Sequence, residues 1–204
     1  MKLHEAESPN ARRVHVFMAE KGIDIPRVPV DIRAGENLSP EYLAKNPMGR
    51  VPTLELDDGS FLAESVAICR YLEGLHPEPC LFGKGALEQA RIEMWNRRAE
   101  LNFAMPAASA FRNISGFFKD RETCVPEWGR VCAEEAKSKL GVFEEQLGRS
   151  RFLAGDEFSI ADISMGVFYG FANVVEKMAG VDLELARPNL QRWNEELSKR
   201  PSFA

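Results

Sequence analysis

The hydrophobic pattern of this chain changes once along its length, and the change divides it into two kinds of structure. Up to about residue 75, short segments with alternating apolar residues are mixed with segments whose apolar residues recur every three or four positions. Beyond about residue 85 only the helical spacing is found. The stretch between them, HPEPCLFGKG (76–85), holds two prolines and two glycines and has no periodicity. We therefore expect an α/β domain at 1–76, a linker at 77–85 and an all-helical domain at 86–204.

The first domain is predicted to follow the order βαβα-ββα. Asp58-Gly59 suits the turn of a hairpin between the last two strands, because glycine readily adopts the positive φ angles that tight hairpin turns need. Ser39 followed by Pro40 is typical of the start of a helix. The strands are expected at residues 1–6, 28–32, 51–56 and 61–62, and the helices at 11–21, from 39 and at 68–75.

The second domain is expected to contain helices only. Ser159 and Asp162 form the S-x-x-D pattern of a helix that begins with a side-chain cap and an acidic first turn. Four apolar stripes have helical spacing: Met94, Leu101 and Met105; Ala136, Leu140, Phe143 and Leu147; Ile160, Ile163, Val167 and Phe171; and Leu190, Trp193 and Leu197.

Charge and composition exclude several functions. The formal net charge is -5, so we expect no nucleic-acid partner. The cysteines and histidines are irregularly spaced, which favours neither a disulfide framework nor a metal site, and His15 is expected on a helix surface. No apolar run approaches the roughly 20 residues that span a bilayer, so we expect a cytoplasmic protein with no membrane partner. The glycine motifs of nucleotide sites are missing.

Three short polar segments are candidates for binding. Pro52 could form a cis bond with Val51, which would leave the Val51 amide and carbonyl able to pair with a small extended peptide. The alternative is an ordinary turn proline. Glu64-Ser65 stands where a helix begins, so the helix amides could hold a carboxylate while Glu64 takes an ammonium group, as an α-amino acid head group requires. The alternative is that Ser65 only caps its own helix.

Ser8 and Asn10 form the third candidate, at the start of the first helix. Their hydroxyl and carboxamide could donate hydrogen bonds to an anion, or Ser8 could be a simple helix cap.

Together these segments resemble the cytosolic glutathione transferases. The resemblance covers essentially the whole chain and rests on V-P before the third strand, E-S after the fourth, and FLAGDEFSIADIS (152–164). The stretches SPNARRVHVFMAEKGI (8–23) and VPTLELDDGSFLAESVAICRYLE (51–73) are similar to a bacterial and fungal subgroup that lacks the usual catalytic tyrosine. The resemblance implies a thioredoxin-like domain joined to a helical bundle, a homodimer, glutathione as cosubstrate and no cofactor.

The resemblance also implies a role for each candidate residue. Ser8 and Asn10 would be catalytic, as hydrogen-bond donors to the glutathione thiolate. Lowering a thiol pKa by about two units takes roughly 2.7 kcal/mol. The implied glutathione contacts are Val51 with a cis Pro52 for the cysteinyl backbone, Glu64 and Ser65 for the γ-glutamyl group, Arg50 for the glycyl carboxylate, and Asn37 as polar lining.

In the second domain the resemblance implies a pocket for a small hydrophobic electrophile, lined by Asn102, Phe103, Met105 and Phe111. Some tyrosine-lacking members use a water held by Ser and His, but Asn113 stands here where His is frequent, which does not favour that mechanism. The expected reaction is conjugation of glutathione in detoxification. Two alternatives stay open: glutathione-dependent peroxide or disulfide reduction, and a non-catalytic glutathione-binding module. The helices at 64–75 and around 102–111 are the expected dimer surfaces.

Overall fold

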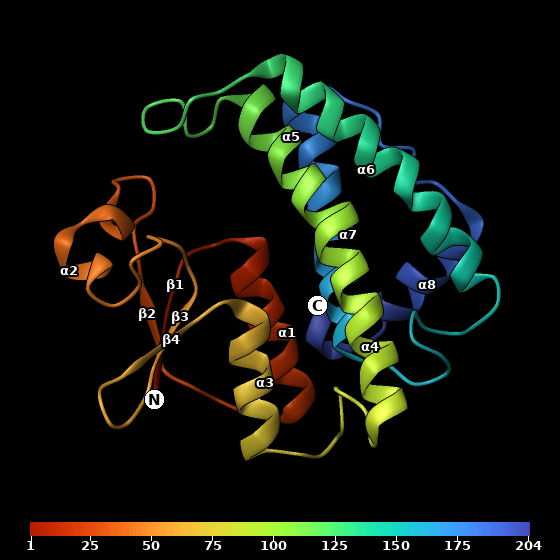
Figure 1. Ribbon diagram of the computed structural model, residues 1–204, viewed down its shortest axis with the longest axis horizontal. Coiled ribbons are helices and arrows are strands. Elements are labelled where there is room, and N and C mark those ends of the chain that lie inside the picture. Colours follow the sequence, from red (N-terminus) through yellow and green to blue (C-terminus); the bar gives the residue numbers. More distant parts are fainter. The chain divides into compact units, whose positions relative to one another are not determined.

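The computed structural model describes residues 1–204, and the chain separates into two units, Met1–Cys80 and Leu81–Ala204. The division falls inside the proline- and glycine-rich stretch at 76–85. Figure 1 shows that all the strands belong to the first unit and that the second is built from helices. None of the helices combines the length and the apolar character needed to cross a lipid bilayer.

The first unit contains a four-stranded mixed sheet in the order β2-β1-β3-β4. β1 pairs in parallel with β2, through His4 and Val28, and antiparallel with β3, through His4 and Thr53. β3 and β4 form the expected hairpin around Gly59, whose φ is 82°. The strands are β1 (Lys2–Glu5), β2 (Arg27–Pro29), β3 (Thr53–Glu55) and β4 (Phe61–Ala63).

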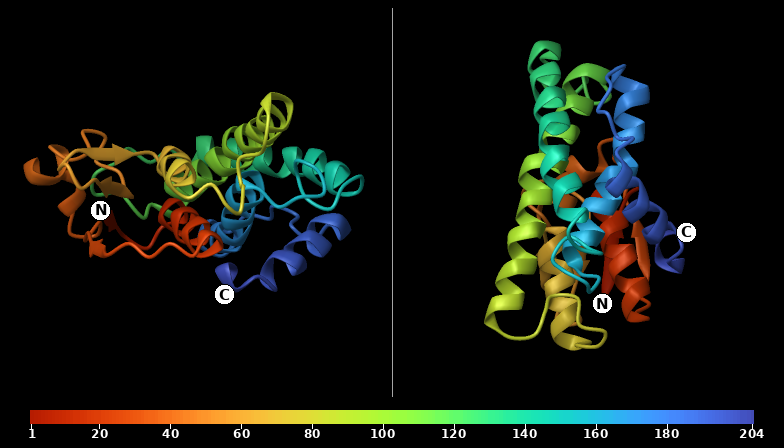
Figure 2. Two further views of the ribbon diagram at one scale, coloured as in Figure 1. Left: turned by 90° about the horizontal axis from the view of Figure 1, so that it is seen from below. Right: turned by 90° about the vertical axis from the view of Figure 1, so that its right-hand side faces the viewer.

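Two long helices, α1 (Pro9–Lys21) and α3 (Ser65–Leu75), pack side by side on one face of this sheet (Figures 1 and 2). Because β1 and β2 are parallel, the chain between them must cross over, and α1 provides this connection. The core between sheet and helices is formed by residues with no exposed surface: Leu3, Val14, Phe17, Leu54, Ile68 and Leu72. The remaining short helices are η1 (Glu36–Leu38) and α2 (Pro40–Leu43).

The second unit is all-helical, as expected. α7 has twelve buried residues and packs against α4 and α5, while α6 runs along α5 and contacts α8 (Figures 1 and 2). The elements are α4 (Ala86–Ala99), η2 (Glu100–Ala104, a π-helical turn), α5 (Met105–Ser115), α6 (Pro126–Leu147), α7 (Ile160–Ala179), α8 (Pro188–Ser198) and η3 (Pro201–Phe203).

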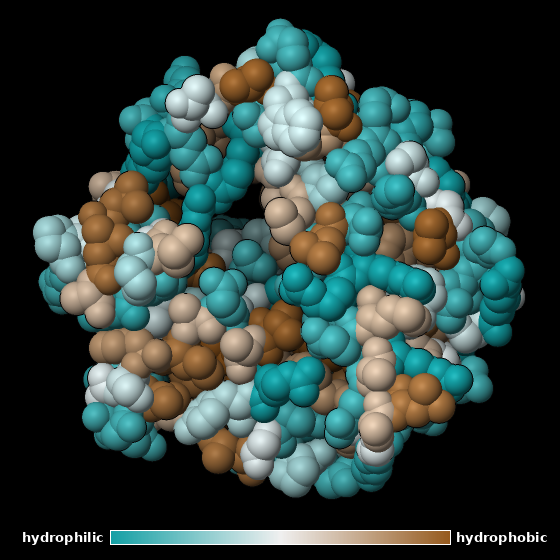
Figure 3. Space-filling model, in the orientation of Figure 1, coloured by the Kyte–Doolittle hydropathy of each residue, from teal (hydrophilic) through white to brown (hydrophobic).

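One predicted apolar stripe does not face the core. Met94, Leu101 and Met105 are 40%, 45% and 59% exposed, whereas Trp95 and Phe103 are buried. The segment from α4 to α5 carries apolar residues on more than one side, so spacing alone could not tell which side is buried. On the face drawn in Figure 3, such exposed apolar residues form small patches within a largely hydrophilic surface.

The start of α7 confirms the predicted helix cap. Ser159 is the N-cap residue, and Asp162 accepts hydrogen bonds from the Ser159 amide at 3.2 Å and hydroxyl at 3.1 Å. Asp162 also accepts from the Leu153 amide at 2.9 Å and the Trp193 indole at 3.0 Å. One buried carboxylate therefore joins the loop before α7, the first turn of α7 and α8.

Candidate functional site

Ser8 is the N-cap residue of α1. Its Oγ accepts a hydrogen bond from the Ala11 amide at 3.2 Å, and Pro9 follows in the first turn. A hydroxyl that accepts one bond still has its own proton to donate. Ser8 can therefore cap the helix and donate to an anion at the same time. The hydrogen bond from the Ala11 amide to Oγ polarises the hydroxyl in the direction that favours donation.

A buried arginine joins the start of α1 to the start of α3. Arg13 is 2% exposed, and its guanidinium donates to Ser65 Oγ at 2.7 Å and to Asn10 Oδ1 at 3.3 Å. The Ser65 hydroxyl is in turn 3.4 Å from Asn10 Oδ1. Because a guanidinium can only donate, the Asn10 atom that faces it must be the oxygen. The Asn10 amide nitrogen, with its two hydrogens, takes no part in this cluster, and Asn10 itself is exposed.

The start of α3 has an unusual backbone. Glu64 precedes it with φ 66° and ψ 111°, a conformation that residues other than glycine rarely adopt and that costs free energy. Its side chain does not cap the helix. Ser65 is the first residue of α3 and turns its hydroxyl toward Asn10 and Arg13, so the alternative that Ser65 only caps its own helix is wrong. The first amides of α3 therefore face outward without a side-chain cap.

The peptide bond between Val51 and Pro52 is cis, as expected. β3 begins only at Thr53, and the amide and carbonyl of Val51 make no hydrogen bond within the chain. The loop before Val51 is held through the Arg50 carbonyl, which accepts from the Tyr42 hydroxyl at 2.9 Å and from Asn46 Nδ2 at 2.8 Å. Val51 is thus a fixed backbone donor and acceptor next to the sheet.

Asn37 supports this loop from η1. Its Nδ2 donates to the Gly49 carbonyl at 2.7 Å, while its Oδ1 is buried without a hydrogen-bond partner. Gly49 has φ 59°, and a Cβ at this position would lie 2.9 Å from a methyl carbon of Leu38. The side chain of Arg50 is exposed at the end of this loop. Asn37 therefore acts first as a brace for the loop, and its role as polar lining stays a prediction.

The candidates in the second unit differ in exposure. Phe103 is fully buried in the helical core, so its predicted place in an open electrophile pocket is wrong. Met105 is exposed, and Asn102 is half-buried with its Nδ2 3.3 Å from the Arg98 carbonyl. Phe111 is half-buried within an aromatic cluster, where its ring centroid lies 5.5 Å from that of Phe117 and 5.4 Å from that of Phe171.

Asn113 is occupied by the structure of the helical unit. Its Nδ2 donates to the Ser109 carbonyl at 2.9 Å, and its Oδ1 accepts from the Val125 amide at 2.9 Å. The carboxamide thereby links α5 to the residue before α6. This arrangement agrees with the expectation that Asn113 does not replace a histidine that holds a catalytic water.

Sequence reasoning missed two side chains close to the Ser8 segment. Arg13 was not singled out, although it stands beside Val14 on the side of α1 that faces the core. His15 was expected on the helix surface, but its side chain is only 19% exposed, and its Nε2 contacts the Glu5 carboxylate. For His15 a signal existed, because a buried polar residue must find a partner and Glu5 stands only ten positions away. For Arg13 no local signal existed, because its partner Ser65 is 52 positions away on another helix.

Comparisons with known proteins identify the family of both domains. A family model for the N-terminal domain of glutathione S-transferases matches residues 7–75, and one for the C-terminal domain matches residues 97–195. Glutathione S-transferase 2 of Saccharomyces cerevisiae is 35% identical over 95% of this chain and 83% of its own length. Glutathione S-transferase 3 of Zea mays is 32% identical over 96% of this chain and 87% of its own length.

Solved structures give the same result. A glutathione S-transferase domain-containing protein of Marinobacter aquaeolei VT8 has a TM-score of 0.92 at 36% identity, with 100% of both chains covered. Gtt2 of Saccharomyces cerevisiae has a TM-score of 0.90 at 34% identity, with 100% of this chain and 98% of the other covered. The two domain models, the relatives and the shared architecture lead to one conclusion: the chain belongs to the glutathione S-transferase family and is a transferase enzyme.

Proposed function

We propose that this enzyme binds glutathione in its first domain, ionises the thiol with Ser8 and Asn10, and conjugates the thiolate to small hydrophobic electrophiles. It acts as a cytoplasmic homodimer without a cofactor and belongs to the subgroup that lacks the usual catalytic tyrosine. The domains are 1–76 and 86–204, joined by a linker at 77–85. The observation that carries the proposal is the hydrogen-bonded cluster of Arg13, Asn10 and Ser65, which brings the starts of two helices together.

Two helix starts at one place favour an anion there. The start of α3 contributes amides without a side-chain cap, the start of α1 adds the partial positive charge of a helix N-terminus, and the buried Arg13 adds a full charge behind them. The γ-glutamyl carboxylate of glutathione fits the uncapped amides of α3 and the Ser65 hydroxyl, and its ammonium group fits the Glu64 carboxylate. The strained backbone of Glu64 supports this role, because such strain is concentrated at functional positions.

The rest of glutathione extends along the edge of the loop before β3. The unpaired amide and carbonyl of Val51 can form two hydrogen bonds with the cysteinyl backbone, as in the addition of a short strand. The exposed side chain of Arg50 can reach the glycyl carboxylate. The hydrogen bonds from Asn37 to the Gly49 carbonyl and from Tyr42 and Asn46 to the Arg50 carbonyl hold this loop before the ligand arrives.

Thiol ionisation follows from the donors at the start of α1. The thiol gives its proton to solvent, and the thiolate accepts hydrogen bonds from the Ser8 hydroxyl and the Asn10 amide nitrogen. Two hydrogen bonds to an ionised group, each worth about 1.5–3 kcal/mol, cover the roughly 2.7 kcal/mol that a pKa lowered by two units requires. The sulfur then forms a bond to the electrophilic carbon, and the leaving group departs with the bonding electrons.

The placement of the tyrosine hydroxyls supports the tyrosine-lacking assignment. The Tyr42 hydroxyl donates to the Arg50 carbonyl and is within hydrogen-bond distance of the Thr53 hydroxyl, and the Tyr169 hydroxyl donates to the Leu185 carbonyl. Burial raises the pKa of both phenols above their usual value, so neither is adapted to supply a phenolate. The third tyrosine, Tyr71, lies in the second half of α3, away from its start. No tyrosine occurs in the segment that carries Ser8 and Asn10.

The homodimer is supported by the exposed apolar stripe formed by Met94, Leu101 and Met105. Light scattering after size exclusion tests this assignment. Leu101→Lys should give a monomer, whereas Val174→Lys, at an apolar position of α7 that is 42% exposed, should leave the dimer intact. A dimer that survives Leu101→Lys would remove this stripe from the interface.

The function itself is tested by retention on immobilised glutathione, followed by assays with a model aryl halide and with cumene hydroperoxide. Retention with turnover of the aryl halide is the expected result. Turnover of the hydroperoxide alone would favour peroxide reduction, and retention without any turnover would favour a binding module. A chain that does not bind glutathione would contradict the proposal, and Ser65→Ala should weaken retention without unfolding the protein.

A further inference from the structure

We propose that His15 is a positioning residue for thiol activation: through its contact with Glu5, it fixes the short segment that carries Ser8. The inference rests on the proposed role of Ser8. The contact joins His15 Nε2, in the second turn of α1, to the carboxylate of Glu5, the last residue of β1. Only three residues, 6–8, connect β1 to α1, and Ser8 is the last of them.

Glu5 is a suitable anchor because the sheet holds it from the other side. Its carbonyl accepts a hydrogen bond from the Val30 amide at 2.7 Å, and Glu5 pairs with Pro29 of β2. The second carboxylate oxygen lies 3.9 Å from Arg27 Nε. His15 therefore reaches from the helix to a carboxylate whose backbone is part of the sheet.

Burial makes this contact more effective than one at the surface. The side chains of His15 and Glu5 are 19% and 13% exposed, so water competes for their polar atoms less than at an exposed position. The contact closes a loop from residue 5 to residue 15 that encloses Ser8 and Asn10. With one end of the loop in the sheet and the other on α1, the position of the Ser8 hydroxyl relative to the sheet is determined.

Position matters here because the proposed donor must lie within about 3 Å of the sulfur to stabilise a thiolate. A displacement of about 1 Å can cost as much as a hundredfold in rate. Loss of the His15 contact leaves the cap bond from Ala11 to Ser8 in place, so α1 still forms. What is lost is the fixed distance between the start of α1 and the end of β1.

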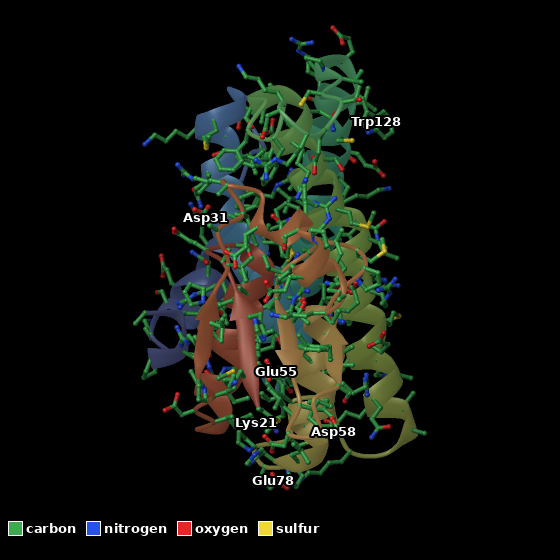
Figure 4. All side chains as sticks on the ribbon, turned by 90° about the vertical axis from the view of Figure 1, so that its left-hand side faces the viewer. Lys21, Asp31, Glu55, Asp58, Glu78 and Trp128 are labelled. Carbon is green, nitrogen blue, oxygen red and sulfur yellow. The ribbon has the colours of Figure 1, made fainter.

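The sheet offers a matched control. His4 Nε2 lies 2.8 Å from the carboxylate of Glu55, which joins β1 to β3 rather than to α1. Glu55 is labelled on the sheet in Figure 4. Both pairs link a histidine to a glutamate of the same unit, and His4 is even more buried, at 5% exposure. A purely structural histidine should therefore behave like His4.

The test compares His15→Phe, His15→Gln and His4→Gln by two measurements: a titration of the bound thiol, followed by thiolate absorbance, and kcat and KM with saturating electrophile. His15→Phe should raise the thiol pKa by about one unit and lower kcat about tenfold, with little change in the KM for glutathione. His15→Gln, which keeps a donor, should recover part of the loss. His4→Gln should lower the unfolding midpoint without moving the thiol pKa.

A double-mutant cycle with Ser8→Ala shows whether His15 acts through Ser8. In the Ser8→Ala background, His15→Phe should have little further effect on the thiol pKa. An equal effect in both backgrounds, or a thiol pKa and kcat unchanged by His15→Phe and His15→Gln, would overturn the inference. If Ser8→Ala itself leaves the thiol pKa unchanged, the proposed role of Ser8 fails first. A thiol pKa that shifts in Ser8→Ala but in neither His15 variant would overturn the role of His15 and leave the role of Ser8 intact.

Discussion

Replacement of Asp162 by Asn tests how the start of α7 is stabilised. The carboxylate has no exposed surface and accepts four hydrogen bonds, from the Leu153 amide, the Trp193 indole, and the amide and hydroxyl of Ser159. Burial raises the pKa of Asp162 from 3.8 to about 6, although these hydrogen bonds act in the opposite direction. The carboxamide of the Asp162→Asn variant would be neutral at every pH, and its single oxygen could accept only some of the four hydrogen bonds.

The raised pKa of Asp162 determines how the free energy of unfolding changes with pH. Between pH 3.8 and about 6 the folded chain holds more protons on Asp162 than the unfolded chain, so this group's contribution to the free energy of unfolding falls as pH rises. The difference of about two units, at about 1.4 kcal/mol each, corresponds to about 3 kcal/mol. The stability advantage of the wild type over Asp162→Asn should therefore shrink by up to about 3 kcal/mol between about pH 4 and about pH 7.

Urea unfolding followed by tryptophan fluorescence measures this difference, because all three tryptophans lie in the second unit. Taking the difference between wild type and variant cancels the groups that both proteins share. Asp156→Asn, at an exposed position in the same unit, controls for the general effect of replacing an aspartate by asparagine. A wild-type advantage that grows with pH would contradict this sign, because it would show that the hydrogen bonds outweigh burial and lower the pKa of Asp162.

Close packing in α7 and ligand binding in the first unit can each be tested by substitution. Gly166→Ala should destabilise the second unit by about 1–3 kcal/mol, because a Cβ there would lie 2.6 Å from a Leu197 side-chain carbon. On the same helix, a Cβ at Gly170 would meet nothing within 4 Å, so Gly170→Ala should stabilise the second unit by up to about 1 kcal/mol. Urea unfolding measures both changes. Ser65→Ala should raise the KM for glutathione about tenfold and change kcat less, since one charge-assisted hydrogen bond is worth about 1.5–3 kcal/mol. An unchanged KM would exclude Ser65 from the glutathione site. Gly49→Ala should raise the same KM, because the crowded Cβ moves the loop that carries Arg50.

The features that could be predicted from the sequence depend on neighbouring residues. Ser8 and Ser159 stand at helix starts because cap and helix are adjacent in the chain, and the Val51-Pro52 bond is a local property. The hairpin at Gly59 follows in the same way from its turn residues.

The features that could not be predicted depend on contacts between distant residues. The partner of Arg13, Ser65, is 52 positions away, so no local pattern indicates that this arginine is buried. For the same reason the sequence could not decide that Phe103 faces the core and Met105 the solvent. Residue type and spacing define candidate helix faces, but packing against α6 and α7 selects the face that is buried.

Titration of the bound thiol in Ser8→Ala measures whether the Ser8 hydroxyl stabilises the glutathione thiolate. Ser39→Ala is the matched control, because Ser39 caps α2 through the same type of bond, at the same 3.2 Å, as Ser8 caps α1. Loss of one hydrogen bond to the thiolate should raise the thiol pKa by about one to two units in Ser8→Ala and leave it unchanged in Ser39→Ala. An unchanged thiol pKa in Ser8→Ala, with glutathione still bound, would contradict the account.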